Sequence, residues 1–138
     1  MTKQDLKSGE QKSQRATERE ISKDQWTTFL AEFTYENRGA RARLEVIGPE
    51  VGHQVQRDDR SFNGISTNTK DGEDAVWITF VFGREDRLTY GIRNVAAIRV
   101  HTPVIQSGTA LEVVAHDKTR TLLELSRPED FALTAATR

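Results

Sequence analysis

The sequence predicts an α+β domain in which one N-terminal amphipathic helix packs on an antiparallel meander or partly closed barrel of six to eight strands. Residues 26–33 place apolar side chains at the i, i+3, i+4, i+7 spacing that is typical of one helix face. From residue 41 onward, short runs alternate between apolar and polar residues and are separated by turn signals, which is typical of antiparallel strands. No second helical pattern lies between these runs, whereas a parallel sheet would need crossover helices there.

The chain of 138 residues is long enough for one domain, and its composition suggests three segments. Residues 1–20 are rich in Lys, Gln, Ser, Glu and Arg, and such a segment buries too little apolar surface to order itself. We therefore expect a disordered polar tail over residues 1–20, a single α+β domain over residues 21–127, and a loosely ordered C-terminus over residues 128–138.

The helix carries its own start, buried face and end. Its apolar stripe consists of Trp26, Phe29, Leu30 and Phe33. Ser22 and Gln25 have the spacing of a capping box, and Ile21 precedes the cap as one half of a hydrophobic staple. Gly39 follows the last turn, where a left-handed residue commonly ends a helix.

Eight short runs then follow as predicted strands. They cover residues 41–46, 53–57, 62–66, 75–82, 88–93, 98–101, 109–116 and 119–125. The run at 75–82 is apolar on both faces, so we expect a central strand that is covered on both sides. One face carries Trp77, Thr79 and Val81, and a single short helix is too small to cover both faces.

The composition excludes several classes of function. The chain has no cysteine, which removes disulfides and thiolate metal sites and fits a reducing cytoplasm. The formal net charge is −1, with 20 basic and 21 acidic residues, and this balance argues against nucleic-acid binding. No apolar run approaches the roughly 18 residues that a membrane span needs. We expect a cytoplasmic protein that does not enter a membrane.

The sequence indicates no catalytic, cofactor-binding or metal-binding set of residues. The three histidines, His53, His101 and His116, are widely separated and lack the spacing of a zinc site. Glu45 and Glu112 alternate with core residues, so we expect both to face solvent with no reason for a raised pKa. The chain has neither a Gly-x-Ser-x-Gly nucleophile motif nor a glycine-rich phosphate loop.

Several blocks of the sequence resemble a known family. The most specific are Gln-Trp-x-x-Phe at residues 25–29 and Leu-Glu-Val-Ile-Gly at residues 44–48, within a resemblance that runs from about Ile21 to Leu125. These blocks are similar to a bacterial family of small uncharacterised domains, a domain-of-unknown-function family. The resemblance implies one bacterial domain. It implies no activity, ligand or catalytic residue.

Two functions from different classes follow from the residues. The first is a non-catalytic interaction module that forms a homodimer or binds a protein partner through Trp77, Thr79 and Val81, because an uncovered apolar face is typical of an interface. The alternative is a small-ligand-binding domain or small enzyme with a pocket at the mouth of the barrel. The candidate pocket residues are His53, Arg93, His101 and Glu112.

Overall fold

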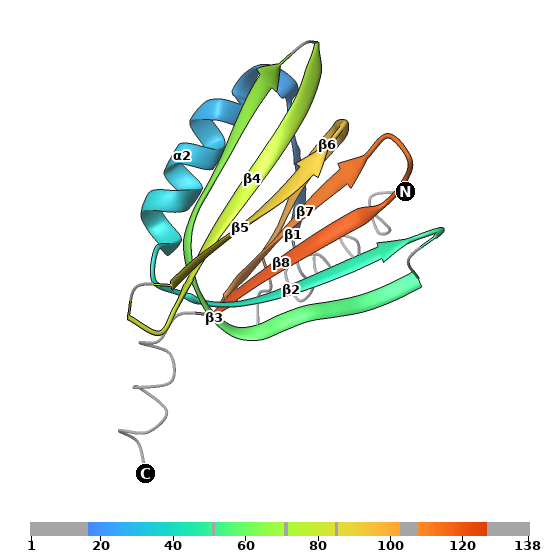
Figure 1. Cartoon of the computed structure of the whole chain (residues 1–138). Helices are drawn as coiled ribbons and strands as arrows, with labels where there is room; N and C mark the ends of the chain where they lie inside the picture. The colour runs from blue at the N-terminus through green and yellow to red at the C-terminus, as the bar shows by residue number, and fades with distance from the viewer. Residues whose placement is uncertain (1–16, 51, 71, 85, 103–107, 127–138) are drawn as a thin grey trace, which may run out of the picture.

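A computed structural model describes residues 17–50, 52–70, 72–84, 86–102 and 108–126. These residues form eight strands and one α-helix (Figure 1). In chain order the elements are β1 (Thr17–Ile21), the short 3₁₀ turn η1 (Lys23–Gln25), α2 (Trp26–Asn37), β2 (Arg41–Gly48), β3 (Gly52–Lys70), β4 (Glu73–Phe82), β5 (Asp86–Arg93), β6 (Val95–Thr102), β7 (Thr109–Ala115) and β8 (Arg120–Ser126). The predicted α+β class, with one helix on an antiparallel sheet of up to eight strands, is confirmed. None of the described helices has the length and hydrophobicity to span a bilayer.

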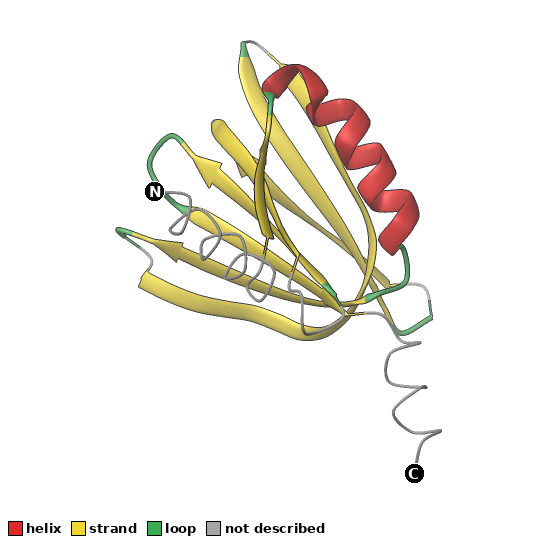
Figure 2. Cartoon of the chain, turned by 180° about the vertical axis from the view of Figure 1, so that it is seen from behind, coloured by secondary structure: helices red, strands yellow, loops and turns green. Residues whose placement is uncertain are grey.

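All eight strands form one antiparallel sheet in the order β1-β6-β7-β8-β2-β3-β4-β5. The sheet is therefore more than a meander, because β2 lies between β3 and β8, and β1 pairs with β6. It curls until β4 approaches β6 and β5 approaches β7, yet β1 and β5 remain separate edges (Figures 1 and 2). The sheet is thus curled but is not closed into a barrel.

The first strand, β1, corrects the predicted domain start. Residues 17–20 belong to β1 rather than to a tail, and β1 pairs with β6 from Thr17 opposite Thr102 to Ile21 opposite Ile98. The helix is consequently not the first element. Residues 1–16 of the expected tail and the expected loose C-terminus at 128–138 lie outside the described residues.

The helix begins differently from the predicted capping box. The Ser22 side chain makes no capping hydrogen bond, and the Gln25 amide instead donates to the Ser22 carbonyl at 2.9 Å in η1. The predicted apolar stripe and helix end are correct: Trp26, Leu30 and Phe33 are buried, and Gly39 has a φ of +90°. The Trp26 indole also donates to the Ile21 carbonyl at 3.0 Å, which ties the helix to β1.

The longest strand, β3, bends and serves two neighbours. Its first part pairs with β2 as far as Ser61, and its second part pairs with β4. The two predicted strands at 53–57 and 62–66 are therefore one element. Beyond Ser61, α2 takes the place of a strand: the Thr34 hydroxyl accepts from the Ile65 amide at 2.9 Å and donates to the Ile65 carbonyl at 3.1 Å (Figure 2). The amide and carbonyl of Ile65 are thus satisfied on the side of the helix.

One hydrophobic core lies inside the curl, between the sheet and α2. The helix contributes its buried stripe, and the strands contribute every second residue. Fully buried side chains from six elements meet there: Leu30, Phe62, Val76, Ile78, Phe80, Val95, Ile98, Leu111, Val113 and Leu123. The opposite, outer face of each strand is consequently available for function.

Candidate functional site

The β4–β5 hairpin forms one end of the sheet and exposes apolar side chains. Among the described residues, four large hydrophobic side chains are exposed, and three of them are on this hairpin: Trp77 and Phe82 at 39% and Leu88 at 38%. We call Trp77, Thr79, Val81, Phe82 and Leu88 the β4–β5 edge surface. Its position next to an unpaired strand edge distinguishes it from scattered apolar surface.

Trp77 extends over the edge strand because its neighbours there are small. It pairs with Gly91 on β5 and with Ser66 on β3. A Cβ atom on Gly91 would lie 2.3 Å from the Trp77 ring, so the indole rests directly on the Gly91 backbone. The indole N–H points to the Asn68 side-chain oxygen at 3.5 Å. The ring therefore reaches the border of the sheet.

The outer face of β4 differs from the prediction of a strand covered on both sides. Within the described chain no helix or strand packs on Trp77, Thr79 or Val81, and the latter two are half-buried by their neighbours in the sheet. Only the opposite face of β4 contributes to the core. The role of these three residues as an interface stays a prediction.

A second feature is a belt of charged side chains across the outer face of β1, β6, β7, β8, β2 and β3. We call it the charged belt, and it contains Glu18, Glu20, Arg43, Glu45, His53, Arg99, His101, Glu112, Arg120 and Glu124. Its two central carboxylates, Glu45 and Glu112, both lie opposite Leu122 of β8. Strand alternation places them on the outer face, as the sequence predicts.

Glu112 is nevertheless buried, with 5% of its surface exposed, and the expectation that it faces solvent is wrong. Its carboxylate lies 3.5 Å from Arg99, 3.2 Å from Arg120 and 3.4 Å from the His101 ring. These partners come from both neighbouring strands and supply the hydrogen bonds that a buried carboxylate requires. Glu112 is therefore held by the belt rather than presented to a substrate.

Glu45 is buried for the same reason, at 8% exposure. Its carboxylate pairs with the His53 ring at 2.5 Å and with Arg43. The hydrogen bond from His53, followed by the charge of Arg43, lowers the pKa of Glu45 below its ordinary value, although burial acts in the opposite direction. A carboxylate with a lowered pKa is a poor general base at neutral pH.

The charged belt also holds the one described group of side chains with metal-ligand chemistry. Glu18, His101 and Glu112 offer ligand atoms that all lie within 4.8 Å of one another. The two nitrogens of His101 face different glutamates, Glu18 at 3.5 Å and Glu112 at 3.4 Å. Because Arg99 and Arg120 already neutralise Glu112, a divalent cation would be repelled by two guanidinium groups. The geometry is that of an ion-pair network.

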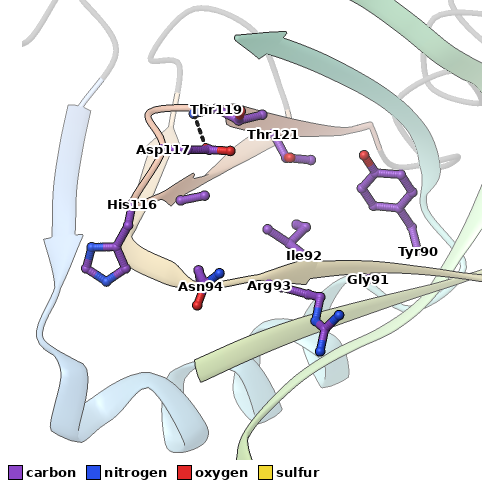
Figure 3. A pocket seen from close by; sticks show the side chains of 10 residues that line it. Tyr90, Gly91, Ile92, Arg93, Asn94, His116, Asp117, Thr119 and Thr121 are labelled. Carbon is purple, nitrogen blue, oxygen red and sulfur yellow. Dashed lines mark hydrogen bonds between the residues drawn. The ribbon is translucent and has the colours of Figure 1, made fainter. Parts of the chain in front are cut away.

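The four sequence-predicted pocket residues do not share one site. His101 and Glu112 lie together in one part of the charged belt. His53 is in another part of it, where it contacts Glu45 of β2, and β2 is two strands away from the β7 strand of Glu112. Arg93 lines a cleft on the other side of the sheet, but its guanidinium donates to Glu73 at 3.1 Å (Figure 3).

That cleft lies between β5 and the β7–β8 hairpin and has a volume of about 540 Å³ (Figure 3). It is lined by Tyr90, Gly91, Ile92, Arg93, Asn94, Ala115, His116, Asp117, Thr119 and Thr121. Sequence reasoning missed the contribution of Tyr90, Asp117 and Thr121, because these residues come from strands and turns that meet only when the sheet curls. The one feature of the sequence that pointed to this cleft is the alternation of β5, which places Tyr90 on the core side of the sheet.

These features define a small α+β domain with a curled open sheet, an apolar sheet edge, a neutralised charged belt and a cleft between β5 and the β7–β8 hairpin. Residues 17–133 match the family of unknown function DUF5335, and the chain belongs to that family. Neither a curated protein nor a solved structure matches the chain.

Proposed function

We propose that this domain is a non-catalytic interaction module that self-associates through β5 and the β4–β5 edge surface. The observation that carries the proposal is the concentration of exposed apolar side chains beside a free strand edge. Trp77 covers one face of the hairpin next to this edge, and Leu88 and Phe82 lie on the other face. A strand added to β5 would shield apolar groups on both faces at once.

The backbone of β5 supports this proposal. Its eight residues pair with β4 without a register shift, and β5 contains no proline. Long, regular edges without proline or a bulge are the ones that accept a further strand most readily. Their unpaired N–H and C=O groups provide the hydrogen bonds, and the flanking side chains provide the apolar contact.

A second copy of the chain is the occupant that fits best. An antiparallel edge is complementary to itself about a two-fold axis, so two β5 strands form the same contacts in both directions. β5 also carries charges of both signs, with Asp86 near its start and Arg87 and Arg93 along it. The copies therefore do not oppose each other with one uniform charge.

The proposed setting is the cytoplasm of a bacterium. The resemblance to a bacterial domain family supports the source, and the absence of cysteine from the sequence fits a reducing compartment.

Replacing Leu88 with lysine tests the proposal. The mass of the purified wild-type protein, measured by light scattering after size exclusion, is expected to be twice the 15.6 kDa of one chain. Leu88→Lys should give the mass of one chain, because a lysine on an edge strand blocks pairing. Circular dichroism checks that the variant is folded, and Trp77→Lys provides a second variant on the other face of the hairpin.

The matched control is Tyr35→Lys, which removes the other large exposed hydrophobic side chain of the described chain. Tyr35 is 84% exposed on α2 and is not part of the β4–β5 edge surface, so this variant should keep the double mass. A wild-type monomer at millimolar concentration would overturn the proposal. So would a folded Leu88→Lys variant that remains a dimer, or a Tyr35→Lys variant that becomes a monomer.

A further inference from the structure

We infer that the cleft between β5 and the β7–β8 hairpin is a binding site for an uncharged, hydroxyl-bearing ring compound, the chemistry shared by nucleosides and sugars. The cleft contains no residue of the β4–β5 edge surface, but Tyr90, Gly91, Ile92 and Arg93 of β5 line it, so a ligand in the cleft and a strand added to β5 would share this part of the edge. The inference goes beyond self-association. The cleft volume of about 540 Å³ falls within the roughly 300–1,000 Å³ of small-molecule sites.

The inner wall of the cleft is apolar and accommodates a ring. Ile92 and Ala115 line it and are buried at 8% and 7% exposure. Tyr90 stands at one end as a half-buried aromatic wall, opposite the turn that carries Asp117 (Figure 3). A flat ligand with an apolar face can therefore pack between the Tyr90 ring and the aliphatic floor.

Convergent polar groups surround this apolar surface. Thr121 projects from β8 and is almost completely buried, at 2% exposure, although its side chain is polar. Burial of Tyr90 raises the pKa of its phenol, so the phenol stays neutral and both donates and accepts hydrogen bonds. Asn94 and Thr119 add further donors and acceptors at the rim. Hydroxyl groups, which also donate and accept, match this set.

The charges of the lining residues select against an anion. The Arg93 guanidinium leads away from the cleft and pairs with Glu73 (Figure 3). Asp117 is the one lining carboxylate, and the Thr119 amide donates to it at 2.9 Å. This backbone hydrogen bond lowers the pKa of Asp117 and keeps it ionised. A phosphate group would meet this negative charge while the Arg93 guanidinium is paired with Glu73, whereas a hydroxyl group would donate a hydrogen bond to Asp117.

The test uses four named probes: adenosine, AMP, glucose and glucose 6-phosphate. Binding is followed by shifts of the backbone amide signals of isotope-labelled protein during titration. We expect adenosine or glucose to shift the amides of Asn94, Thr119 and Thr121, and the phosphorylated partner to bind at least tenfold more weakly. Comparing the amide shifts caused by adenosine with those caused by glucose shows whether the site prefers nucleosides or sugars.

Two threonine variants separate a site from general surface binding. Thr121→Val removes the buried hydroxyl but keeps the side-chain shape, so affinity should fall by about tenfold, the equivalent of one hydrogen bond. Thr28→Val makes the same change at an exposed position of α2, outside both the cleft and the β4–β5 edge surface, and should leave affinity unchanged. An unchanged mass of Thr121→Val in light scattering would show that the effect is independent of self-association.

The inference is overturned if neither neutral probe shifts the cleft amides, if the phosphorylated probes bind as well as the neutral ones, or if both threonine variants bind alike. These outcomes leave the masses of the Leu88→Lys and Tyr35→Lys variants unaffected, so the two proposals fail separately.

Discussion

The two edges of the sheet, β1 and β5, present opposite solutions to the same problem. Every open sheet ends in strands with unpaired backbone groups, and natural proteins guard such edges against unwanted pairing. β1 is five residues long, whereas β5 has eight. β1 is also charged, with Glu18 and Glu20 bound to side chains of the neighbouring strand β6.

The difference extends to how each edge is anchored. β1 ends in Ile21, which is buried at 3% exposure, and the Trp26 indole donates to the Ile21 carbonyl. β5 contains Leu88 and lies next to Trp77 of β4, and both side chains keep more than a third of their surface exposed to solvent. The comparison teaches that β1 is the anchored edge of the sheet and β5 the more exposed one, which is the edge that we propose for self-association.

The largest effect that separates the two edges is on stability. Ile21→Ala should lower the free energy of unfolding by about 2–5 kcal/mol, because it removes a buried side chain from the core. Leu88→Ala should cost about 1 kcal/mol or less, because that side chain is partly exposed. Urea denaturation at low protein concentration measures both. Equal costs at the two positions would contradict the contrast between an anchored edge and an exposed one.

A smaller effect is expected where Trp77 covers β5. A Cβ atom at Gly91 would lie 2.3 Å and 2.7 Å from two ring atoms of Trp77, so Gly91→Ala should displace the indole. We expect the free energy of unfolding to fall by about 1 kcal/mol and the tryptophan emission to shift to the red as the ring enters solvent. Ser66→Ala, on the opposite neighbour of Trp77, is the control and should leave the emission unchanged.

Trp26 is buried at 4% exposure and should contribute a constant background to this emission. An unshifted spectrum in Gly91→Ala would show that the indole does not rest on β5.

The smallest effect concerns the ion pair that joins the segment after β1 to the β4–β5 hairpin. Lys23, which follows β1, lies 2.7 Å from Asp74 at the start of β4. Hydrogen bonds from Lys23 and then from Thr69 lower the pKa of Asp74. A lowered pKa stabilises the fold above the unfolded value of about 3.9, and this contribution is lost as pH falls through the folded value.

Asp74→Asn should therefore reduce stability at neutral pH by less than about 1 kcal/mol, because Lys23 is largely exposed. The difference from wild type should disappear in acid, once the pH is below the lowered pKa of Asp74, because protonated Asp74 is then as uncharged as the asparagine that replaces it. Urea denaturation as a function of pH measures it, and the double variant Lys23→Met/Asp74→Asn isolates the pair. A difference that persists in acid would assign the effect to packing instead.

Local patterns were sufficient to predict the helix and most strands. The spacing of Trp26, Leu30 and Phe33 defines the buried face of α2, and alternation defines β4 and β5. The start of the helix was not predictable in this way, because a main-chain 3₁₀ bond competes with the Ser22 hydroxyl. β1 was missed because its polar composition matches both a tail and a guarded edge strand, and only its pairing with β6 distinguishes them.

The site features depend on strand order, which the sequence does not contain. Alternation correctly placed Glu45 and Glu112 on the outer face. Their burial depends on partners such as Arg99 and Arg120, which reach Glu112 only because β6, β7 and β8 are neighbours. The cleft between Tyr90 and Thr121 likewise requires the curl of the sheet.

The position of β2 between β3 and β8 has a consequence for synthesis on the ribosome. β3, β4 and β5 form consecutive hairpins and can pair as soon as they emerge. β2 must wait for β8, the last described strand, and β1 must wait for β6. Folding that depends on such distant pairings is slow, on the order of milliseconds to seconds. The nascent chain therefore holds β1 unpaired until β6 has been synthesised, and one side of β2 unpaired until β8 has been synthesised.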